Sequence, residues 1–444
     1  MREGGIFMWR RLKCVVQKKE PRTDRKKIWD HVTRRQVVSG CVGCALILGT
    51  FVGIGKILPK QEPIIIDESS VFTVEEVAAE KAPADAPFQV AAKGAVLMDA
   101  STGEVLFEQD SHERLPLASV TKIMTMLLVM EAVDDGKISL DDQVTISERA
   151  ASMGGSQMYM EVGETHTVAQ LMEGVAMASA NDGCVALSEY VAGSEEIFVE
   201  RMNQRAKELG MGNTHFVNTN GLPVADHYSS AYDIAVMSRE LYRHEETHTW
   251  FTTWQSTITV GLPGKEKEFG LTNTNKLVKH YEGCNGIKTG FTSEAGFCLS
   301  ASATRGETHL IAVALGSTTS KIRNAEVAKL LDYGFANFET VVLAEEGQVM
   351  ETVLVEKGTP TSVNAVTLQK ITALTPKGEA DTIRSQVTIA ETVPLPLKKG
   401  QEIGILTIYE GEKSIAEYPL VAEGMVEKAS FGELLGRLVQ AARH

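Results

Sequence analysis

The alternation of apolar and polar positions predicts a β-hairpin early in a long folded segment. Residues 94–110 read GAVLMDASTGEVLFEQD, in which two alternating runs flank a Ser-Thr-Gly turn. Farther along, apolar residues recur with the spacing of a helix instead of alternating. These later runs predict helices at about 119–134, 168–192, 195–210 and 321–337.

After residue 250 the pattern returns to strands. STITV, GIKTGFTSEAGFCLSASA and THLIAVALG are apolar runs bounded by turn residues. Strands at both ends of the segment, with helices between them, predict one α/β (α+β) domain over residues 91–340. Its sheet would take strands from both ends of the segment.

A second domain of different texture follows. Residues 341–424 contain short alternating runs separated by Gly, Pro and Lys, which predicts a small all-β domain. Residues 425–444 then place Phe431, Leu435 and Leu438 on one face of an amphipathic helix. This helix would either dock on the β domain or lie on a membrane surface.

The first 90 residues differ from the rest in charge and hydropathy. Residues 1–35 are strongly basic, residues 36–58 contain the uncharged run VVSGCVGCALILGTFVGIG, and residues 59–90 are rich in Glu, Ala and Pro. An apolar run of this length can cross a bilayer as a helix. The sequence therefore predicts a basic cytoplasmic segment, a transmembrane anchor and an acidic linker, in that order. A cleaved signal, including one of the twin-arginine type at Arg34-Arg35, is the alternative.

The charge distribution places the folded body outside the cell and limits its partners. Basic residues before the apolar run orient the N-terminus to the cytoplasm, so the body would lie on the extracytoplasmic face of the cell membrane. The whole chain has a net charge of −14 even though its N-terminal segment is basic. So acidic a body is unsuited to nucleic acid, because phosphate recognition needs basic surface.

Ser119 and Lys122 stand three residues apart in LPLASVTKIMT, at the predicted start of a helix. Side chains at this spacing share one helical face. A serine hydroxyl needs a base to become a nucleophile, and a lysine can act as that base when burial or a nearby positive charge lowers its pKa. A serine at a helix start also has a simpler explanation as a capping residue, so the pair needs support from elsewhere.

Two further motifs supply that support. Ser179-Ala180-Asn181 follows one predicted helix, and Lys288-Thr289-Gly290 lies in a predicted strand. The order Ser-x-x-Lys, Ser-x-Asn, Lys-Thr-Gly is the signature of penicillin-interacting serine acyl enzymes. Ser179 can relay protons, Asn181 can hold a substrate amide, and Lys288 can lower the pKa of Lys122 and attract an anionic substrate. Gly290 would let a substrate backbone lie against the strand edge.

With these motifs the sequence resembles the low-molecular-weight penicillin-binding proteins that are serine-type D-alanyl-D-alanine carboxypeptidases. The resemblance covers about residues 90–425 and includes NTNGLPVADHYSSAYD, NTNKL, GIKTGFTSEAGFCLSASA and the ending IAEYPLVA. It implies a penicillin-binding/β-lactamase-like catalytic domain with an antiparallel sheet flanked by helices, without a cofactor. It also implies removal of the terminal D-alanine from peptidoglycan stem pentapeptides, and β-lactam antibiotics as covalent inhibitors.

The resemblance implies roles for single residues. Ser119 corresponds to the acylated nucleophile, Lys122 to its general base, Ser179 and Asn181 to the middle motif, and Lys288 to the electrostatic partner.

The same resemblance implies a substrate-binding edge. The oxyanion hole would use the backbone N–H groups of Ser119 and Phe291, next to Gly290. The terminal carboxylate of the substrate would meet Thr289 and Arg323.

The sequence also contains a motif of another enzyme class. His244-Glu-Glu-Thr-His248 matches the zinc-peptidase motif, with Glu268 as a possible third ligand, but RHEETHTW is polar and Glu268 lies near a hairpin tip. A class A β-lactamase would need a Glu-x-x-Leu-Asn segment, and none occurs between Asn181 and Lys288. A DD-endopeptidase of the same acyl-enzyme class is a further alternative that fits the same motifs.

Overall fold

The computed structural model describes residues 88–441. The basic segment 1–35, the apolar segment 36–58 and nearly all of the linker 59–90 lie outside the described residues, so the anchor remains a prediction. Within residues 88–441, no helix is both long and apolar enough to cross a membrane.

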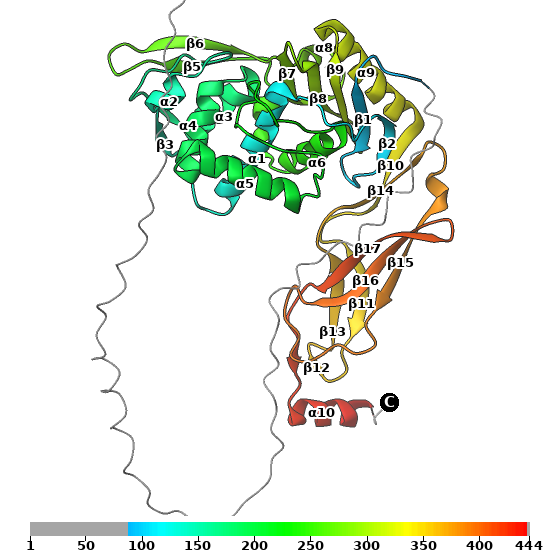
Figure 1. The fold of residues 1–444 in the computed structure, drawn as a ribbon. Coiled ribbons are helices and arrows are strands. Elements are labelled where there is room, and N and C mark those ends of the chain that lie inside the picture. Colours follow the sequence, from blue (N-terminus) through cyan, green and yellow to red (C-terminus); the bar gives the residue numbers. More distant parts are fainter. Residues whose placement is uncertain (1–87, 442–444) are drawn as a thin grey trace, which may run out of the picture. The chain divides into compact units, whose positions relative to one another are not determined.

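A five-stranded antiparallel sheet forms the centre of the first domain (Figure 1). Its strand order is β2-β1-β9-β8-β7. β1 pairs with β9, with Val96 opposite Val313, so the sheet joins the two ends of the segment as the sequence pattern predicts. β7 is an edge strand. The strands are β1 (Gly94–Asp99), β2 (Val105–Gln109), β7 (Cys284–Thr292), β8 (Gly296–Arg305) and β9 (Thr308–Ser317).

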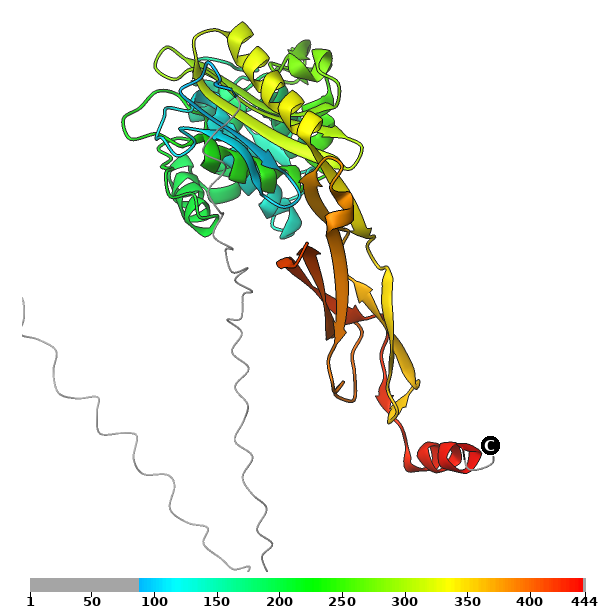
Figure 2. The same cartoon turned by 90° about the vertical axis from the view of Figure 1, so that its right-hand side faces the viewer.

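The sheet separates two hydrophobic cores because successive strand residues point to opposite faces. Ala95 and Leu97 of β1 pack with α9 (Ser320–Asn337), which lies across one face in Figure 2. Val96 and Met98 point the other way, into the larger core built with α1 (Lys122–Asp134) and α6 (Ala231–Tyr242). Helices thus flank both faces, which confirms the fold expected from the resemblance.

The remaining helices and short ladders form a helical lobe between β2 and β7. Its main helices surround the buried α1 and share its core. The elements are β3 (Gln143–Thr145), α2 (Glu148–Ala151), β4 (Thr165–Thr167), α3 (Val168–Met177), α4 (Asn181–Ala192), α5 (Glu195–Glu208), α7 (Glu246–Thr252), β5 (Gln255–Val260), β6 (Lys267–Thr272) and α8 (Leu277–His280).

Two predicted helices are interrupted at the motif residues. The run 168–192 is two helices, because Ser179 has a backbone φ of 63°, outside the right-handed helical region. The run 119–134 starts as a 3₁₀ turn, η1 (Ala118–Thr121), before α1 begins at Lys122. Ala118 also has a positive φ, of 50°. Both serine motifs therefore lie at left-handed turns that introduce helices.

The C-terminal part is all-β, as predicted, and ends in a helix. Its main sheet has the order β11-β13-β17-β16-β15, and β10 pairs with β14 and β12 with β18. The elements are β10 (Phe338–Ala344), β11 (Val349–Leu354), β12 (Gly358–Thr359), β13 (Ser362–Thr367), β14 (Ile371–Pro376), η2 (Ala380–Thr382), β15 (Ile383–Ile389), β16 (Glu402–Glu410), β17 (Lys413–Ala422), β18 (Glu427–Lys428) and α10 (Phe431–Ala441).

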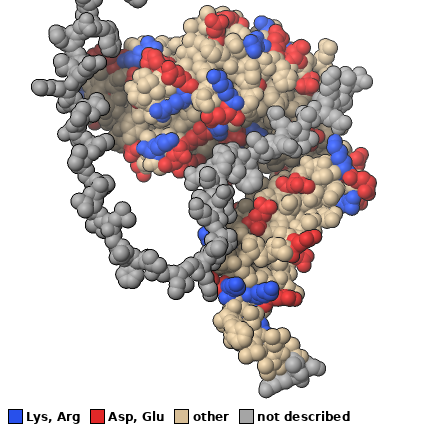
Figure 3. Space-filling model, turned by 60° about the horizontal axis from the view of Figure 1, so that its bottom comes forward, with Lys and Arg blue, Asp and Glu red and all other residues tan. Residues whose placement is uncertain are grey.

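Charged side chains of both signs are interspersed on the face of the molecule drawn in Figure 3. Such mixing gives no field of a single sign over that face.

Candidate active site

The turn that carries Ser119 is held by a chain of hydrogen bonds. Thr121 Oγ1 donates to the carbonyl oxygen of Ala118 at 2.8 Å and lies 2.8 Å from Nε2 of His227. The backbone N–H of Val217 donates to His227 Nδ1 at 2.9 Å. His227 must therefore carry its proton on Nε2 and donate it to Thr121. Burial, the largest cause, lowers the pKa of His227 to about 4, so the ring is neutral at physiological pH.

Lys122 joins Ser119 to the middle motif. Its Nζ lies 3.0 Å from Ser119 Oγ, 2.7 Å from Asn181 Oδ1 and 2.6 Å from the carbonyl oxygen of Asn220. The two carbonyl oxygens can only accept hydrogen bonds. A neutral amine that donates its two N–H bonds to them has its lone pair left for the hydroxyl of Ser119. The geometry thus presents Lys122 as a base for this one hydroxyl.

Burial explains how Lys122 can be a base. The side chain is completely buried, and desolvation of the charged form lowers its pKa to about 8. The sequence predicts that Lys288 contributes to this shift, but burial is the cause that lowers the Lys122 pKa here. Lys122, in contrast, does affect Lys288. Burial is the largest cause that lowers the pKa of Lys288 well below its usual value, and the charge of Lys122 lowers it further.

Ser179 and Asn181 flank the break between α3 and α4. Asn181 Nδ2 donates to the Gly154 carbonyl oxygen at 2.7 Å, which fixes the amide so that its oxygen faces Lys122. Ser179 Oγ is buried and has no hydrogen-bond partner within residues 88–441. A buried hydroxyl without a partner is costly, and such groups cluster where function requires them.

The edge strand β7 approaches the serine turn closely. A Cβ added to Gly290 would lie 2.9 Å from the Leu117 carbonyl oxygen and 3.1 Å from the Ser119 backbone nitrogen. Only glycine allows this approach. The absence of a side chain at Gly290 lets strand β7 pack directly against the backbone of the serine turn. The admission of a substrate backbone at Gly290, which the sequence predicts, would be a second use of the same glycine.

The other motif residues of β7 contact neighbouring parts of the protein. Lys288 is buried, and its Nζ donates to the Thr289 carbonyl oxygen at 3.1 Å. Thr289 Oγ1 donates to Thr274 Oγ1 at 2.8 Å, which ties β7 to the NTNKL segment. Phe291 is 55% exposed, and its ring stacks on Phe297 with centroids 4.2 Å apart.

Arg323 lies behind this strand edge. It is 5% exposed on α9, and its guanidinium donates to Asn324 Oδ1 and, at 3.4 Å, to the Cys298 carbonyl oxygen. Burial lowers its pKa to about 10, and its charge is close enough to lower the pKa of Lys288. The structure brings Ser119, Lys122 and Asn181 into direct contact through hydrogen bonds, whereas within residues 88–441 the hydrogen bonds of Arg323 go to Asn324 and Cys298.

Three groups of the site are not evident from the sequence. The Asn220 carbonyl contributes through its backbone, for which residue identity gives no signal. Thr121 and His227 act on the turn and not on the reacting groups, and 106 positions separate them. The segment NTNGLPVADHYSSAYD contains both Asn220 and His227, so the resemblance pointed to the region without giving their contacts.

The zinc-peptidase motif is used for packing. His244 Nδ1 lies 2.9 Å from Asp134 Oδ2, and His248 Nε2 donates to the Tyr242 carbonyl oxygen at 2.7 Å. The His248 ring also stacks on Tyr242. Across residues 88–441, no group of three or more His, Cys, Asp or Glu residues is arranged to hold a metal ion.

Comparisons with known proteins agree with this geometry. Residues 78–319 match the family model described as D-alanyl-D-alanine carboxypeptidase, peptidase S11, and residues 338–428 match the penicillin-binding protein 5 C-terminal domain. The chain is 45% identical to D-alanyl-D-alanine carboxypeptidase DacF of Bacillus subtilis over 347 residues, covering 78% of this chain and 88% of that protein. It is 34% identical to DacD of Escherichia coli, covering 87% and 99%.

Solved structures give the same result. Penicillin-binding protein 5 from Haemophilus influenzae superposes with a TM-score of 0.63 at 34% identity, covering 77% of this chain and 99% of that one. The matched segments span both domains, and the zinc-peptidase and β-lactamase alternatives are not favoured. The chain therefore belongs to the S11 peptidase family of penicillin-binding, serine-type D-alanyl-D-alanine carboxypeptidases.

Proposed function

We propose that this chain removes the terminal D-alanine of peptidoglycan stem peptides through an acyl-enzyme on Ser119. The single observation that carries the assignment is the position of the Lys122 amine, 3.0 Å from Ser119 Oγ and anchored by two carbonyl oxygens. Among the described serines, Ser119 has this base beside it together with the family signature.

Acylation then follows from the groups in place. Neutral Lys122 takes the proton of Ser119 as its oxygen attacks the carbonyl carbon of the penultimate D-alanine. The negative charge on the carbonyl oxygen would be stabilised by the N–H groups of Ser119 and Phe291, and the close approach at Gly290 supports this pairing. The C–N bond breaks, and the leaving D-alanine takes a proton on its nitrogen.

Ser179 is the proposed carrier of that last proton. Its buried Oγ has no hydrogen-bond partner in the described part of the chain. The hydroxyl is therefore free to accept a proton from one group while it donates its own to another. It would pass a proton from the lysines to the leaving nitrogen. Water then attacks the ester carbonyl, and Lys122 accepts a proton from that water in the second half of the cycle.

The substrate carboxylate would bind at the Lys288 end of the cleft. Thr289 offers a hydroxyl, Lys288 offers N–H donors, and the positive charge of Arg323 attracts an anion. Asn181, which already binds Lys122, would also hold the peptide amide of the substrate. This arrangement selects a peptide with a free C-terminus, which favours carboxypeptidase over endopeptidase action.

Labelling with a fluorescent penicillin tests the nucleophile. The parent and the control Ser385→Ala, on the exposed face of β15, should acquire one covalent label. Ser119→Ala should acquire none while keeping the parental thermal unfolding temperature within a few degrees. Labelling of folded Ser119→Ala would remove Ser119 from this role.

Membrane association is a further part of the proposal. We expect residues 36–58 to anchor the chain with its body on the extracytoplasmic face, and α10 to lie on the membrane surface. Support comes from α10, where Phe431 is 81% and Leu438 67% exposed, while Arg437 donates to the Gly358 carbonyl oxygen. Fractionation of cells expressing the full chain or Leu435→Lys/Leu438→Lys, with external protease, tests both statements. Complete recovery of the full chain in the soluble cytoplasmic fraction would refute them.

A further inference from the structure

An irregular segment beside the catalytic residues is held in place by two consecutive residues of α4. Residues 154–160, between α2 and β4, contain no helix or strand. Within residues 88–441, the hydrogen bonds of this segment all go to Asn181 and Asp182. Asn181 belongs to the middle motif, whereas Asp182 lies just outside it. The attachment of the segment therefore depends in part on a residue that the motif does not include.

The buried carboxylate of Asp182 accepts hydrogen bonds through both of its oxygens. Oδ1 accepts from the backbone N–H of Gly183 at 3.0 Å, which caps the first turn of α4, where Ala180 has no polar side chain to do so. Oδ2 accepts from the N–H groups of Met158 at 3.0 Å and Met160 at 3.5 Å. Capping does not need these last two bonds, which join α4 to a distant part of the chain.

The segment bends around this carboxylate. Tyr159, between the two donors, has a backbone φ of 59°, which is unusual for a bulky residue. Such a conformation persists only where the surrounding contacts enforce it. Here Met158 is completely buried against Gly174 of α3, and the N–H groups on both sides of Tyr159 point to Asp182. The carboxylate and the core together fix the bend.

The fixed segment in turn orients Asn181. The Ser156 carbonyl oxygen accepts from the Asn181 backbone N–H at 2.8 Å, and the Gly154 carbonyl oxygen accepts from its Nδ2 at 2.7 Å. These two bonds leave Asn181 Oδ1 for the amine of Lys122, 2.7 Å away. Asp182 therefore acts on the base through the segment and through Asn181.

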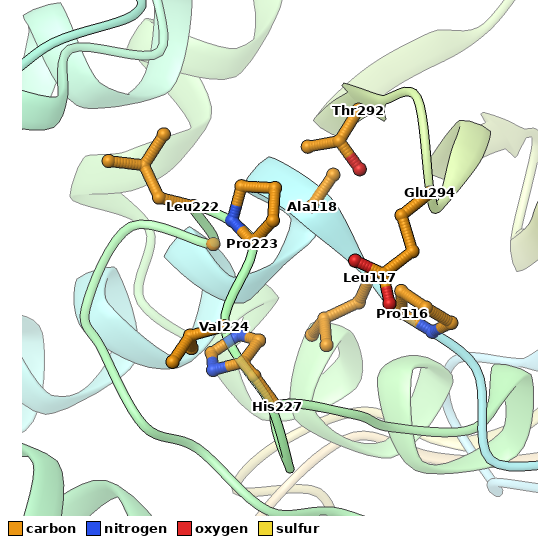
Figure 4. A pocket seen from close by; sticks show the side chains of 10 residues that line it. Pro116, Leu117, Ala118, Leu222, Pro223, Val224, His227, Thr292 and Glu294 are labelled. Atoms are coloured by element: carbon orange, nitrogen blue, oxygen red, sulfur yellow. The ribbon is translucent and has the colours of Figure 1, made fainter. Parts of the chain in front are cut away.

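Asp182 also places a negative charge near the base, which raises the pKa of Lys122 against the effect of burial. Other titratable groups in the surroundings of Lys122 are Cys184 on α4, Glu195 on α5, His227 in the loop after α5 and Lys288 on β7. Figure 4 shows His227 on the same loop as Leu222, Pro223 and Val224.

These neighbours do not replace the charge of Asp182. Burial leaves Cys184 and His227 neutral near pH 8, because it raises the pKa of the thiol to about 12 and lowers that of the ring to about 4. Glu195 is paired with Arg149 at 2.9 Å. Lys288 can contribute only positive charge. Loss of the Asp182 carboxylate would therefore leave Lys122 with less stabilisation of its charged form.

We propose that Asp182 is a positioning residue for acylation, which holds residues 154–160 against the middle motif and thereby keeps Asn181 and the Lys122 amine in line with Ser119. The inference rests on the proposed function, because acylation of Ser119 is what it measures. An asparagine in place of Asp182 would have one acceptor oxygen and an NH₂ group, so it could not accept from both sides.

The test is the pH profile of acylation by a fluorescent penicillin, followed by stopped flow from pH 6 to 10. Asp182→Asn should lower the high-pH plateau about 10- to 100-fold, because a misplacement of about 1 Å at a reacting centre has this effect. It should also move the midpoint below the parental value, because the pKa of Lys122 falls without the anion. Asp182→Glu keeps the charge on a longer side chain, so it should lower the plateau while the midpoint stays near that of the parent.

Asp233→Asn is the matched control. Asp233 is also buried and also holds a loop, since its Oδ2 accepts from the Asn213 N–H and from Thr214 Oγ1. It is not among the groups that act on Lys122. This variant should lose stability but keep the parental plateau and midpoint per folded molecule.

Amide hydrogen exchange in the parent adds a measurement that requires no variant to fold. The N–H groups of Met158 and Met160 should be protected as strongly as those of α4, because they bond to a residue of that helix. Fast exchange at both positions would show that Asp182 does not hold the segment.

The failures are distinguishable. A plateau within twofold of the parent, or a parental midpoint, in folded Asp182→Asn would overturn the positioning role, because an Asp182 that only stabilises α4 would alter neither. Failure of the folded parent to acquire any label would instead overturn the proposed function itself.

Discussion

Replacing Gly290 by alanine should slow acylation and should also destabilise the fold. The new methyl carbon would lie 2.9 Å from the Leu117 carbonyl oxygen and 3.1 Å from the backbone nitrogens of Ser119 and Val120. These neighbours are all backbone atoms of the turn that carries the nucleophile. Ordinary contacts are about 3.5–4.0 Å, so β7 and the turn must separate by roughly half an ångström or more.

The size of the effect follows from that displacement. A misplacement of about 1 Å at a reacting centre can cost about 10²-fold in rate, so we expect the second-order rate constant for penicillin acylation to fall by one to two orders of magnitude. The overpacking should lower the free energy of unfolding by about 1–3 kcal/mol. Stopped-flow labelling measures the first quantity and urea denaturation the second.

A matched glycine separates the local clash from a general effect of the substitution. Gly270 lies on β6, is exposed, and has open space within 4 Å of an added Cβ. Gly270→Ala should acylate at the parental rate. An acylation rate for Gly290→Ala within twofold of the parent would refute the reasoning, because the turn would then have tolerated the displacement.

The other predictions concern the base and the turn. Acylation should rise with pH about a midpoint near 8, because Lys122 must lose its proton to accept one from Ser119; a rate that is flat from pH 6 to 10 would contradict this. The same lowered pKa predicts a free energy of unfolding that increases between about pH 8 and 10.5, because the unfolded chain binds the extra proton there; Lys122→Met should lose that contribution, as urea titrations across this range would detect. Thr121→Val should leave His227 Nε2–H and the Ala118 carbonyl unpaired, at about 1–3 kcal/mol in unfolding free energy, and should slow acylation, whereas Thr121→Ser should restore both. Equal acylation by the Val and Ser variants would show that the hydrogen-bond chain does not position Ser119.

Short-range patterns predicted much of this architecture. Alternation located β1 and β2, and the β textures after residue 250 located β7, β8 and β9. These succeeded because strand alternation and turn residues are local properties. The order of the three motifs also sufficed to name two of the groups that contact Lys122, the side chains of Ser119 and Asn181.

Other features depended on long-range packing. Helical spacing is continuous through Ser179, and only the structure places this residue in a left-handed turn that ends α3. The pKa of Lys122 depends on how completely the fold excludes water from it, which neighbouring residues in the sequence do not specify. The contacts of Lys122 with the Asn220 carbonyl and of Thr121 with His227 join segments distant in sequence.

The buried amine of Lys288 is less well satisfied than that of Lys122. Lys122 and Lys288 are both withdrawn from water, and among the described residues Lys288 has one hydrogen-bond acceptor, the Thr289 carbonyl oxygen. A carboxylate that binds beside Lys288 favours the protonated form of this lysine and supplies its countercharge, so it must stabilise the folded protein by the same interaction that binds it. A thermal-shift measurement could thus rank stem-peptide fragments and β-lactams by how well they satisfy Lys288, without any turnover being followed.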